Sequence, residues 1–235
     1  MGTRKTPLVF GEYYHIYNRG NSRQTIFHDD EDYHHFCKLL YLCNSTKNIN
    51  FRDMVVDAGI DAWNFNKGNS LVSIGAWVLM PNHFHIYIKY QHSPDVEHRG
   101  EKEGTNHVTE FMRKLGTAYA KYFNSKYARS GSLFEGSFKS VHIENDSQAK
   151  YLFSYIHLNP IKLSSSKWKR EGIRDIATVK KFLEKYPWSS YLDHIGINRP
   201  SNKIISLRNF PKYFRNGNAI KKEIFEWLSN EQYAA

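Results

Sequence analysis

The sequence predicts an α+β protein of the ferredoxin-like class, in which an antiparallel βαββαβ sheet carries two helices on one face. Three observations support this fold class. Strand and helix patterns follow the order strand, helix, strand, strand, helix, strand, only a Pro-Asn turn at 81–82 separates the second and third strands, and both helices carry one apolar stripe. A third helix and a basic C-terminal extension are expected after this core.

The first strand is expected over residues 13–19, because aromatic and β-branched residues precede a Gly-Asn-Ser turn there. The first helix is expected to begin in the acidic run 29–32, since negative charge suits a helix N-terminus. It continues to 44–45, with apolar residues at helical spacing: Phe36, Leu39, Leu40 and Cys43.

Residues 46–70 have mixed polarity and predict an insertion with one short helix. The apolar run 71–80 predicts a buried strand, and 86–90 continues a second strand that begins at the histidines after the turn. Residues 91–106 are rich in charge and glycine and predict a loop.

Thr105 or Asn106 can cap the second helix. The apolar stripe of this helix consists of Val108, Phe111, Leu115, Ala118 and Tyr122. The fourth strand is expected over 133–143, with Gly136 allowing a bulge or a close backbone approach.

A third helix is expected to open at 145–147 and to contain residues 151–160. The chain is therefore divided into a domain over 1–163 and a basic extension over 164–235. Within the extension, 164–170 predicts a linker, and the helical candidates are 178–185 and 219–229.

Composition points to nucleic acid. Lys and Arg number 33 against 23 Asp and Glu, the formal charge is +10, and 15% of the residues are aromatic. Cations follow phosphates and aromatic faces stack on unpaired bases, so single-stranded or distorted DNA or RNA is favoured over plain duplex. No run of 18 apolar residues predicts a membrane span, and the two cysteines fit a reducing cytosol, so a cytoplasmic protein without a membrane partner is expected.

The most specific chemical pattern is His83-Phe84-His85. Side chains two apart on a strand point the same way, so both imidazoles can ligate one divalent metal ion if a third donor completes the site. An isolated pair of this kind more often faces solvent. Here the flanking apolar runs place the pair at the start of a central strand, where a rigid scaffold can hold ligands.

Tyr155 and Asn159 form a second pattern, because residues four apart share a helix face. If that face meets His83 and His85, the Asn159 amide oxygen supplies the third ligand and the Tyr155 phenol a nucleophile. The alternative is a buried tyrosine and an asparagine that ends the helix before Pro160, and helix physics alone leaves both interpretations open.

The polar face of the second helix is cationic and consists of Arg113, Lys114, Lys121 and Lys126. These residues suit a solvated surface and a DNA backbone contact equally well.

Five blocks of the sequence, in order, resemble the single-tyrosine HUH transposases and, among them, the REP-associated tyrosine transposases. The blocks are YHIYNRG at 14–20, WVLMPNHFH at 77–85, GSLFEGSFK at 131–139, YIHLNP at 155–160 and WSSY at 188–191. The 46–70 insertion and the long 91–106 loop depart from that resemblance.

The resemblance implies a metal-dependent nuclease in which His83 and His85 bind Mg2+ or Mn2+, Asn159 is the third ligand and Tyr155 is the nucleophile. Tyr151 is the nearest competitor, but the residue four positions after it is Tyr155, a poor ligand while protonated. Attack on single-stranded DNA would give a 5′-phosphotyrosine and a free 3′-hydroxyl, and a new 3′-hydroxyl could reverse the step.

The implied substrate is hairpin-flanked single-stranded DNA, such as REP-type palindromes, handled in a bacterial cytosol or nucleoid. Whether the protein acts as a monomer or a homodimer is left open. Six cations of the main domain are assigned to DNA: Arg19, Arg113, Lys114, Lys121, Lys139 and Lys162. In the extension, the further candidate phosphate partners are Lys180, Lys181, Arg208, Lys212 and Arg215. A solvated surface is the more common role of such charges.

Three other functions fit parts of the pattern. A replication initiator or relaxase uses the same histidines and tyrosine, but the five-block order matches the transposases better. A noncatalytic nucleic-acid-binding module shares the strand and helix order and the sheet aromatics. A metal-dependent hydrolase would use a metal-bound water in place of tyrosine.

Overall fold

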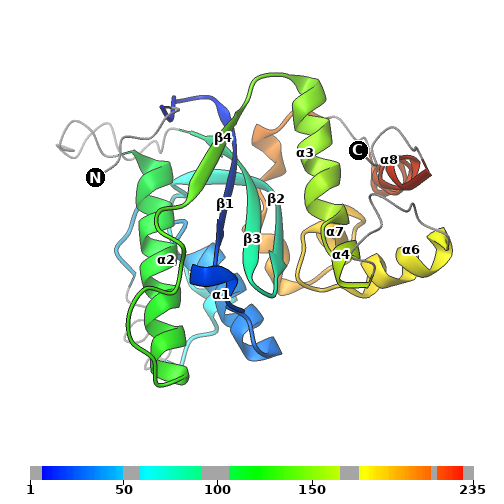
Figure 1. The fold of residues 1–235 in the computed structure, drawn as a ribbon. Helices are drawn as coiled ribbons and strands as arrows, with labels where there is room; N and C mark the ends of the chain where they lie inside the picture. Colours follow the sequence, from blue (N-terminus) through cyan, green and yellow to red (C-terminus); the bar gives the residue numbers. More distant parts are fainter. Residues whose placement is uncertain (1–6, 50–58, 92–105, 165–174, 213–215, 230–235) are drawn as a thin grey trace.

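Four antiparallel strands form a single sheet with the strand order β2-β3-β1-β4, as Figure 1 shows. The computed structural model describes residues 7–49, 59–91, 106–164, 175–212 and 216–229. The strands are β1 (Tyr13–Arg19), β2 (Val72–Met80), β3 (His83–Tyr90) and β4 (Lys139–Ile143). This order and the βαββαβ sequence of elements confirm the predicted ferredoxin-like α+β fold.

Helices α1 (Asp30–Leu42) and α2 (His107–Lys126) are the two crossover helices of this fold. Each begins at a side-chain cap: Asp29 accepts from the Asp32 amide, and Asn106 accepts from the Thr109 amide. Their apolar stripes pack on the sheet face that carries Ile16, Phe84 and Ile86, for example through Phe36 and Phe84, whose ring centroids are 5.1 Å apart. This half of the sandwich follows directly from the helical periodicity of the sequence.

Helix α3 (Asp146–Leu158) packs against β2 and β3, on the sheet face opposite α1 and α2 (Figure 1). Asn145 caps its first turn, and the short helix α4 (Ile161–Ser164) follows Pro160. Further α-helices of the described residues are α6 (Ile176–Lys185), α7 (Tyr191–His194) and α8 (Gly217–Ser229). Short 3-10 helices span Asn21–Arg23, Ala62–Asn64, Pro200–Ile204 and Leu207–Asn209.

Strand β2 is buried along its whole length because protein covers both of its faces and its outer edge. At the outer edge, the Leu79 amide donates to the Trp188 carbonyl at 2.8 Å and the Ser190 amide donates to the Trp77 carbonyl at 2.9 Å. Further along the same edge, the Ser206 amide donates to the Ile74 carbonyl at 2.8 Å. The WSSY block therefore closes an edge that would otherwise expose unpaired backbone groups.

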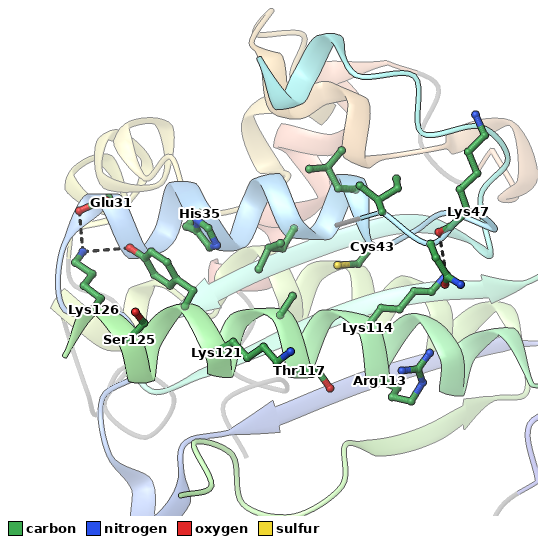
Figure 2. A pocket seen from close by; sticks show the side chains of 16 residues that line it. Glu31, His35, Cys43, Lys47, Arg113, Lys114, Thr117, Lys121, Ser125 and Lys126 are labelled. Atoms are coloured by element: carbon green, nitrogen blue, oxygen red, sulfur yellow. Dashed lines mark hydrogen bonds and ion pairs between the residues drawn. The ribbon is translucent and has the colours of Figure 1, made fainter. Parts of the chain in front are cut away.

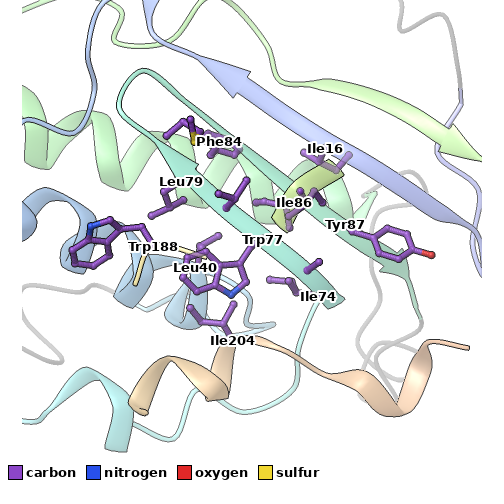
Figure 3. Packing of buried hydrophobic residues seen from close by; sticks show 14 of the residues in the cluster. Ile16, Leu40, Ile74, Trp77, Leu79, Phe84, Ile86, Tyr87, Trp188 and Ile204 are labelled. Carbon is purple, nitrogen blue, oxygen red and sulfur yellow. The ribbon is translucent and has the colours of Figure 1, made fainter. Parts of the chain in front are cut away.

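The hydrophobic core is continuous from the sheet into the C-terminal part of the chain, which Figure 3 shows around Trp77, Trp188 and Ile204. Trp77 is fully buried, and the Tyr33 and Trp188 rings stack at 4.7 Å. Apolar side chains after residue 163 thus join the same cluster as the strands.

The expected bounds of the fourth strand need correction, and several other predicted segments lie partly outside the described residues. The fourth strand is five residues long and begins at Lys139, because residues 133–138 form a turn in which Gly136 has φ of +64° and only Phe134 makes an isolated bridge, to Gly20. Parts of the predicted insertion, loop and linker, at 50–58, 92–105 and 165–170, fall outside the described ranges.

Among the helices of the described residues, none combines the length and apolarity needed to cross a bilayer.

A buried carboxylate ties α1 to α2. Asp32 is fully buried, and its oxygens accept from the Lys126 ammonium at 2.9 Å and from the hydroxyls of Tyr122 and Tyr127 at 3.0 and 2.8 Å. Burial raises the pKa of this carboxyl, but the His28 amide and these three donors outweigh the burial, so the pKa lies below its ordinary value.

Substituting Asp32 by Asn should lower the free energy of unfolding by about 3 kcal/mol, because buried donors lose their charged acceptor. The exposed first-turn residue Asp30 provides a control, since Asp30→Asn should change it by less than about 0.5 kcal/mol. Urea unfolding at several pH values measures both variants. The depressed pKa stabilises the fold above the ordinary carboxyl range, so the Asp32→Asn deficit should be constant there and shrink as pH falls through the lower folded-state pKa. A deficit that does not change down to pH 2 would contradict this account.

Candidate active site

The pairing register of the sheet collects the predicted residues on one face. Tyr17 of β1 lies opposite His85 of β3 and also opposite Lys139 of β4, and Arg19 lies opposite His83. Directly opposed residues project from the same face, so these five side chains share the face on which α3 packs. The prediction that His83 and His85 start a central strand is confirmed.

His83 and His85 lie side by side with ring centroids 5.1 Å apart and planes at 83°. Burial, with a smaller contribution from the charge of nearby Lys162, lowers the pKa of His83 to about 4. Burial also places the pKa of His85 well below its ordinary value. Both imidazoles are therefore neutral near pH 7, which is the form that binds metal ions.

The proton on His83 is placed by its neighbour. Nδ1 of His83 lies 2.6 Å from the Asn82 amide oxygen, and the Asn82 amide nitrogen donates to the Arg23 carbonyl at 3.2 Å, which fixes the orientation of that amide. Since the oxygen can only accept, Nδ1 of His83 carries the proton and Nε2 keeps its lone pair. His83 is thus set up to ligate through Nε2.

A third imidazole, His15 of β1, supports His85. Nε2 of His15 lies 2.8 Å from Nδ1 of His85, and burial lowers the pKa of His15 to about 4. Sequence reasoning assigned no role to His15. Its spacing of two residues from Tyr17 places it on the same strand face, but only the β1–β3 register brings it to His85.

Tyr155 on α3 reaches this cluster. Its ring centroid lies 5.3 Å from that of His85 and 6.1 Å from that of His15, and the Lys162 ammonium lies 5.2 Å from the Tyr155 ring centroid. Tyr151 lies one turn earlier, stacks on Tyr155 at 6.1 Å and contacts Trp227 of α8 at 5.1 Å. Of the two tyrosines, Tyr155 is the one with ring contacts to the imidazoles.

Asn159 follows the last residue of α3 and is only 1% exposed. Its carboxamide raises the pKa of His83, so the two side chains are close, yet neither carboxamide atom has a hydrogen-bond partner of ordinary geometry among the described residues. A buried amide without partners is uncommon and destabilising, and a missing ion or water is one recognised explanation.

These residues fit a divalent metal ion in donor chemistry. Two neutral imidazoles and one amide oxygen suit Mn2+ or Mg2+ better than a structural zinc, which takes four tight nitrogen or sulfur donors. Within the described ranges, no three His, Cys, Asp or Glu side chains gather as a metal site, so an ion held here depends on the Asn159 amide.

The six cations assigned to DNA divide between the two sides of the sheet. Arg19, Lys139 and Lys162 lie at the histidine face, where the Arg19 guanidinium already pairs with Glu135. Lys139 is exposed and Lys162 half-buried.

The other three lie across the sheet from Tyr155, on the outer side of α2 along a groove beside α1, as Figure 2 shows. Arg113 and Lys121 are exposed there, whereas Lys114 donates to the Ser45 carbonyl at 2.8 Å and pairs with Glu110. Because the apolar stripe of α2 must face the sheet, its polar face points away from the histidines.

Searches of known proteins returned distant structural likenesses. The structure is similar to a REP-associated tyrosine transposase bound to a REP hairpin, with 15% identity, coverage of 86% of this chain and 90% of that chain, and a TM-score of 0.47. A protein from Deinococcus radiodurans R1 assigned as a transposase matches with 15% identity, coverage of 64% and 93%, and a TM-score of 0.32. No protein-family model and no curated protein matches the chain. Likenesses with 15% identity and TM-scores below 0.5 do not assign a function to this chain.

The tautomer of His83 can be measured directly. In 15N-histidine-labelled protein at pH 7, long-range 1H–15N spectra should show His83 with Nδ1 protonated and Nε2 unprotonated, and titration should give a pKa of about 4. Asn82→Ala removes the acceptor and should allow the Nε2-protonated form. An Nε2-protonated His83 in the wild-type protein would contradict the hydrogen bond from Nδ1 to the Asn82 amide oxygen. A pKa near the ordinary histidine value would contradict the burial of the His83 imidazole.

Proposed function

We propose that the protein is a metal-dependent single-stranded DNA endonuclease and strand transferase that acts through a 5′-phosphotyrosine on Tyr155. The observation that carries the proposal is the contact of Tyr155 with His85, beside the unpartnered Asn159 carboxamide at His83. Hairpin-flanked DNA is proposed as the substrate because of the five sequence blocks that resemble REP-associated tyrosine transposases.

His83, His85 and Asn159 would hold Mg2+ or Mn2+, which, when bound, withdraws charge from a non-bridging oxygen of the scissile phosphate. The neutral ligand set leaves the charge of the ion uncompensated by the protein. His85 can contribute Nε2 only if its proton is on Nδ1, and His15 Nε2, at 2.8 Å, is the acceptor for that proton. His15 therefore positions His85 and fixes its tautomer.

In the cleavage step, the Tyr155 phenolic oxygen forms a bond to phosphorus as the bond between phosphorus and the 3′ oxygen breaks. The phenol loses its proton and the departing 3′ oxygen gains one, so the products are a 5′-phosphotyrosine and a 3′-hydroxyl. Because the phosphodiester is retained in the protein–DNA bond, a second 3′-hydroxyl can attack it and release Tyr155 without ATP.

Lys162 is the cation best placed to assist this step. Its ammonium lies over the Tyr155 ring and is close enough to His83 to lower the pKa of that imidazole. A phosphate held between Tyr155 and the histidines would therefore meet a positive charge. Burial lowers the pKa of Lys162.

Tyr155→Phe should abolish the covalent adduct and the cleavage of single-stranded DNA while DNA binding is retained. The matched control is Tyr151→Phe, since Tyr151 stacks on Tyr155 from the same helix but has no ring contact with the histidines, and it should retain most activity. The assay is incubation of labelled single-stranded DNA from the flanks of the gene with Mn2+ or Mg2+, followed by denaturing gels.

The same assay separates the alternatives. Cleavage without an adduct, equal in wild type and Tyr155→Phe, would indicate attack by water and exclude the tyrosine nucleophile. Binding without cleavage under any metal would favour a noncatalytic module. An adduct that forms but does not transfer to a second strand between hairpin-flanked ends would favour a replication initiator or relaxase.

Asn159→Ala should weaken Mn2+ binding by about 10-fold or more, and His83→Ala or His85→Ala should weaken it further, because each removes a ligand. His142→Ala provides the control, since His142 lies on β4 and pairs with Glu12. Calorimetric titration of Mn2+ measures the affinity, and thermal unfolding without metal shows that each variant is folded. Equal Mn2+ affinity in the Asn159→Ala variant and the wild type would exclude the amide as a ligand.

A further inference from the structure

A second cavity opens on the histidine side of the sheet and has a volume of about 680 Å3. It is lined by residues of β2, β3, α3, α7 and α8, by several residues within 207–212, and by Asn216. The volume lies within the range of about 300–1,000 Å3 that small-ligand sites occupy.

The inner wall of this cavity is aromatic. Tyr87 of β3 and Phe210 lie with ring centroids 5.0 Å apart, and Tyr13 of β1 contacts both rings, at 6.0 and 5.6 Å. Phe210 reaches the sheet because residue 75 is glycine: a Cβ there would come within 2.6 Å of the Phe210 ring. Gly75 also lies at the irregularity in the β2–β3 register. Tyr87 is only 3% exposed and supports the Phe210 ring from the sheet side, so the half-buried Phe210 ring is the aromatic face that a planar ligand ring could contact.

The rim of the cavity is positively charged. Arg208 and Lys212 line it, both are exposed, and neither forms an ion pair with another described residue. The acidic residue at the cavity, Asp193, is already paired with Arg199 at 2.7 Å. An anionic group at the rim would therefore meet two cations without a competing carboxylate.

The cavity adjoins the candidate active site. Tyr87 follows His85 by two residues on β3, so both side chains project from the same face, about 7 Å apart along the strand. Tyr13, His15 and Tyr17 form the neighbouring column of rings on β1. A strand of DNA whose phosphate lies at His85 would therefore have Phe210 on the same side of the sheet, and an unpaired base could stack on that ring.

We propose that this cavity binds one unpaired nucleotide of the DNA strand that is cut, with its base against Phe210 and its phosphate at Arg208 and Lys212. The proposal rests on the proposed function, because the cavity is assigned to the same DNA strand. It makes the C-terminal segment a part of the substrate site and a determinant of where the strand is cut.

Binding is tested on the full chain without metal, so that cleavage does not contribute. Fluorescence anisotropy with a 5′-labelled random single-stranded DNA pool gives the affinity. Phe210→Ala and Arg208→Ala should each weaken binding by about 5-fold or more, through loss of stacking and of a phosphate contact. The matched controls are Ile197→Ala, an exposed apolar residue, and Lys222→Ala, an exposed cation on α8, and both should stay within 2-fold of wild type.

Mononucleotide binding shows whether a base is recognised. By saturation-transfer NMR, the deoxynucleoside 5′-monophosphates should bind the wild-type protein and compete with the DNA pool, whereas inorganic phosphate should compete at least 10-fold less well. Phe210→Ala should abolish the base signals. If Phe210→Ala changes the core, Gly75→Ala gives a second perturbation, because it displaces the Phe210 ring, and thermal unfolding checks both variants.

Equal competition by phosphate and mononucleotides, or unchanged binding in the Phe210→Ala and Arg208→Ala variants, would overturn the nucleotide pocket. These outcomes are independent of the nucleophile: Tyr155→Phe should bind the pool like wild type, and adduct formation on Tyr155 can succeed although the pocket proposal fails. Conversely, nucleotide binding without any adduct would leave the pocket in place and refute the proposed chemistry.

Discussion

The antiparallel register between β1 and β3 is the constraint on which the candidate site depends. It sets Tyr17 opposite His85 and Arg19 opposite His83, and it brings His15 within hydrogen-bonding distance of His85. A shift of one residue would turn the histidines toward the core beneath α1 and α2 and bring Phe84 to the face on which α3 packs. The register is held because the other face of both strands is apolar and packed in the core. Core packing therefore determines which side chains lie at the candidate site.

Burial then determines the chemical state of the site. Desolvation keeps His15, His83 and His85 neutral, and the Asn82 amide places the His83 proton on Nδ1. The Asn159 carboxamide is buried without a hydrogen-bond partner among the described residues, which is unfavourable by roughly 1–3 kcal/mol in a folded protein. Several other buried polar groups also lack a partner there, but the Asn159 carboxamide lies close to the His83 imidazole, so a ligand held by both groups would satisfy it.

The C-terminal region is a structural part of the same unit. Residues 188–190 cover the outer edge of β2, Trp227 contacts Tyr151 on the helix that carries Tyr155, and Phe210 lies against Gly75. A sheet edge, helix α3 and the second cavity therefore all depend on segments that come after the ferredoxin-like core. This explains why apolar residues such as Trp188 and Tyr191 are found in a region of basic composition.

The sequence by itself determined the order of elements, most helix boundaries and the shared face of His83 and His85, because these follow from local periodicity, capping and the two-residue repeat of a strand. Through the resemblance of its five blocks it also predicted Tyr155, in preference to Tyr151, as the nucleophile. Only the tertiary structure decided that His15 supports His85, that Arg113 and Lys121 lie across the sheet from Tyr155, and that residues 133–138 are a turn. The reason is physical: such relations depend on strand register and on which helix covers which face, and both are fixed by contacts between residues far apart in the chain.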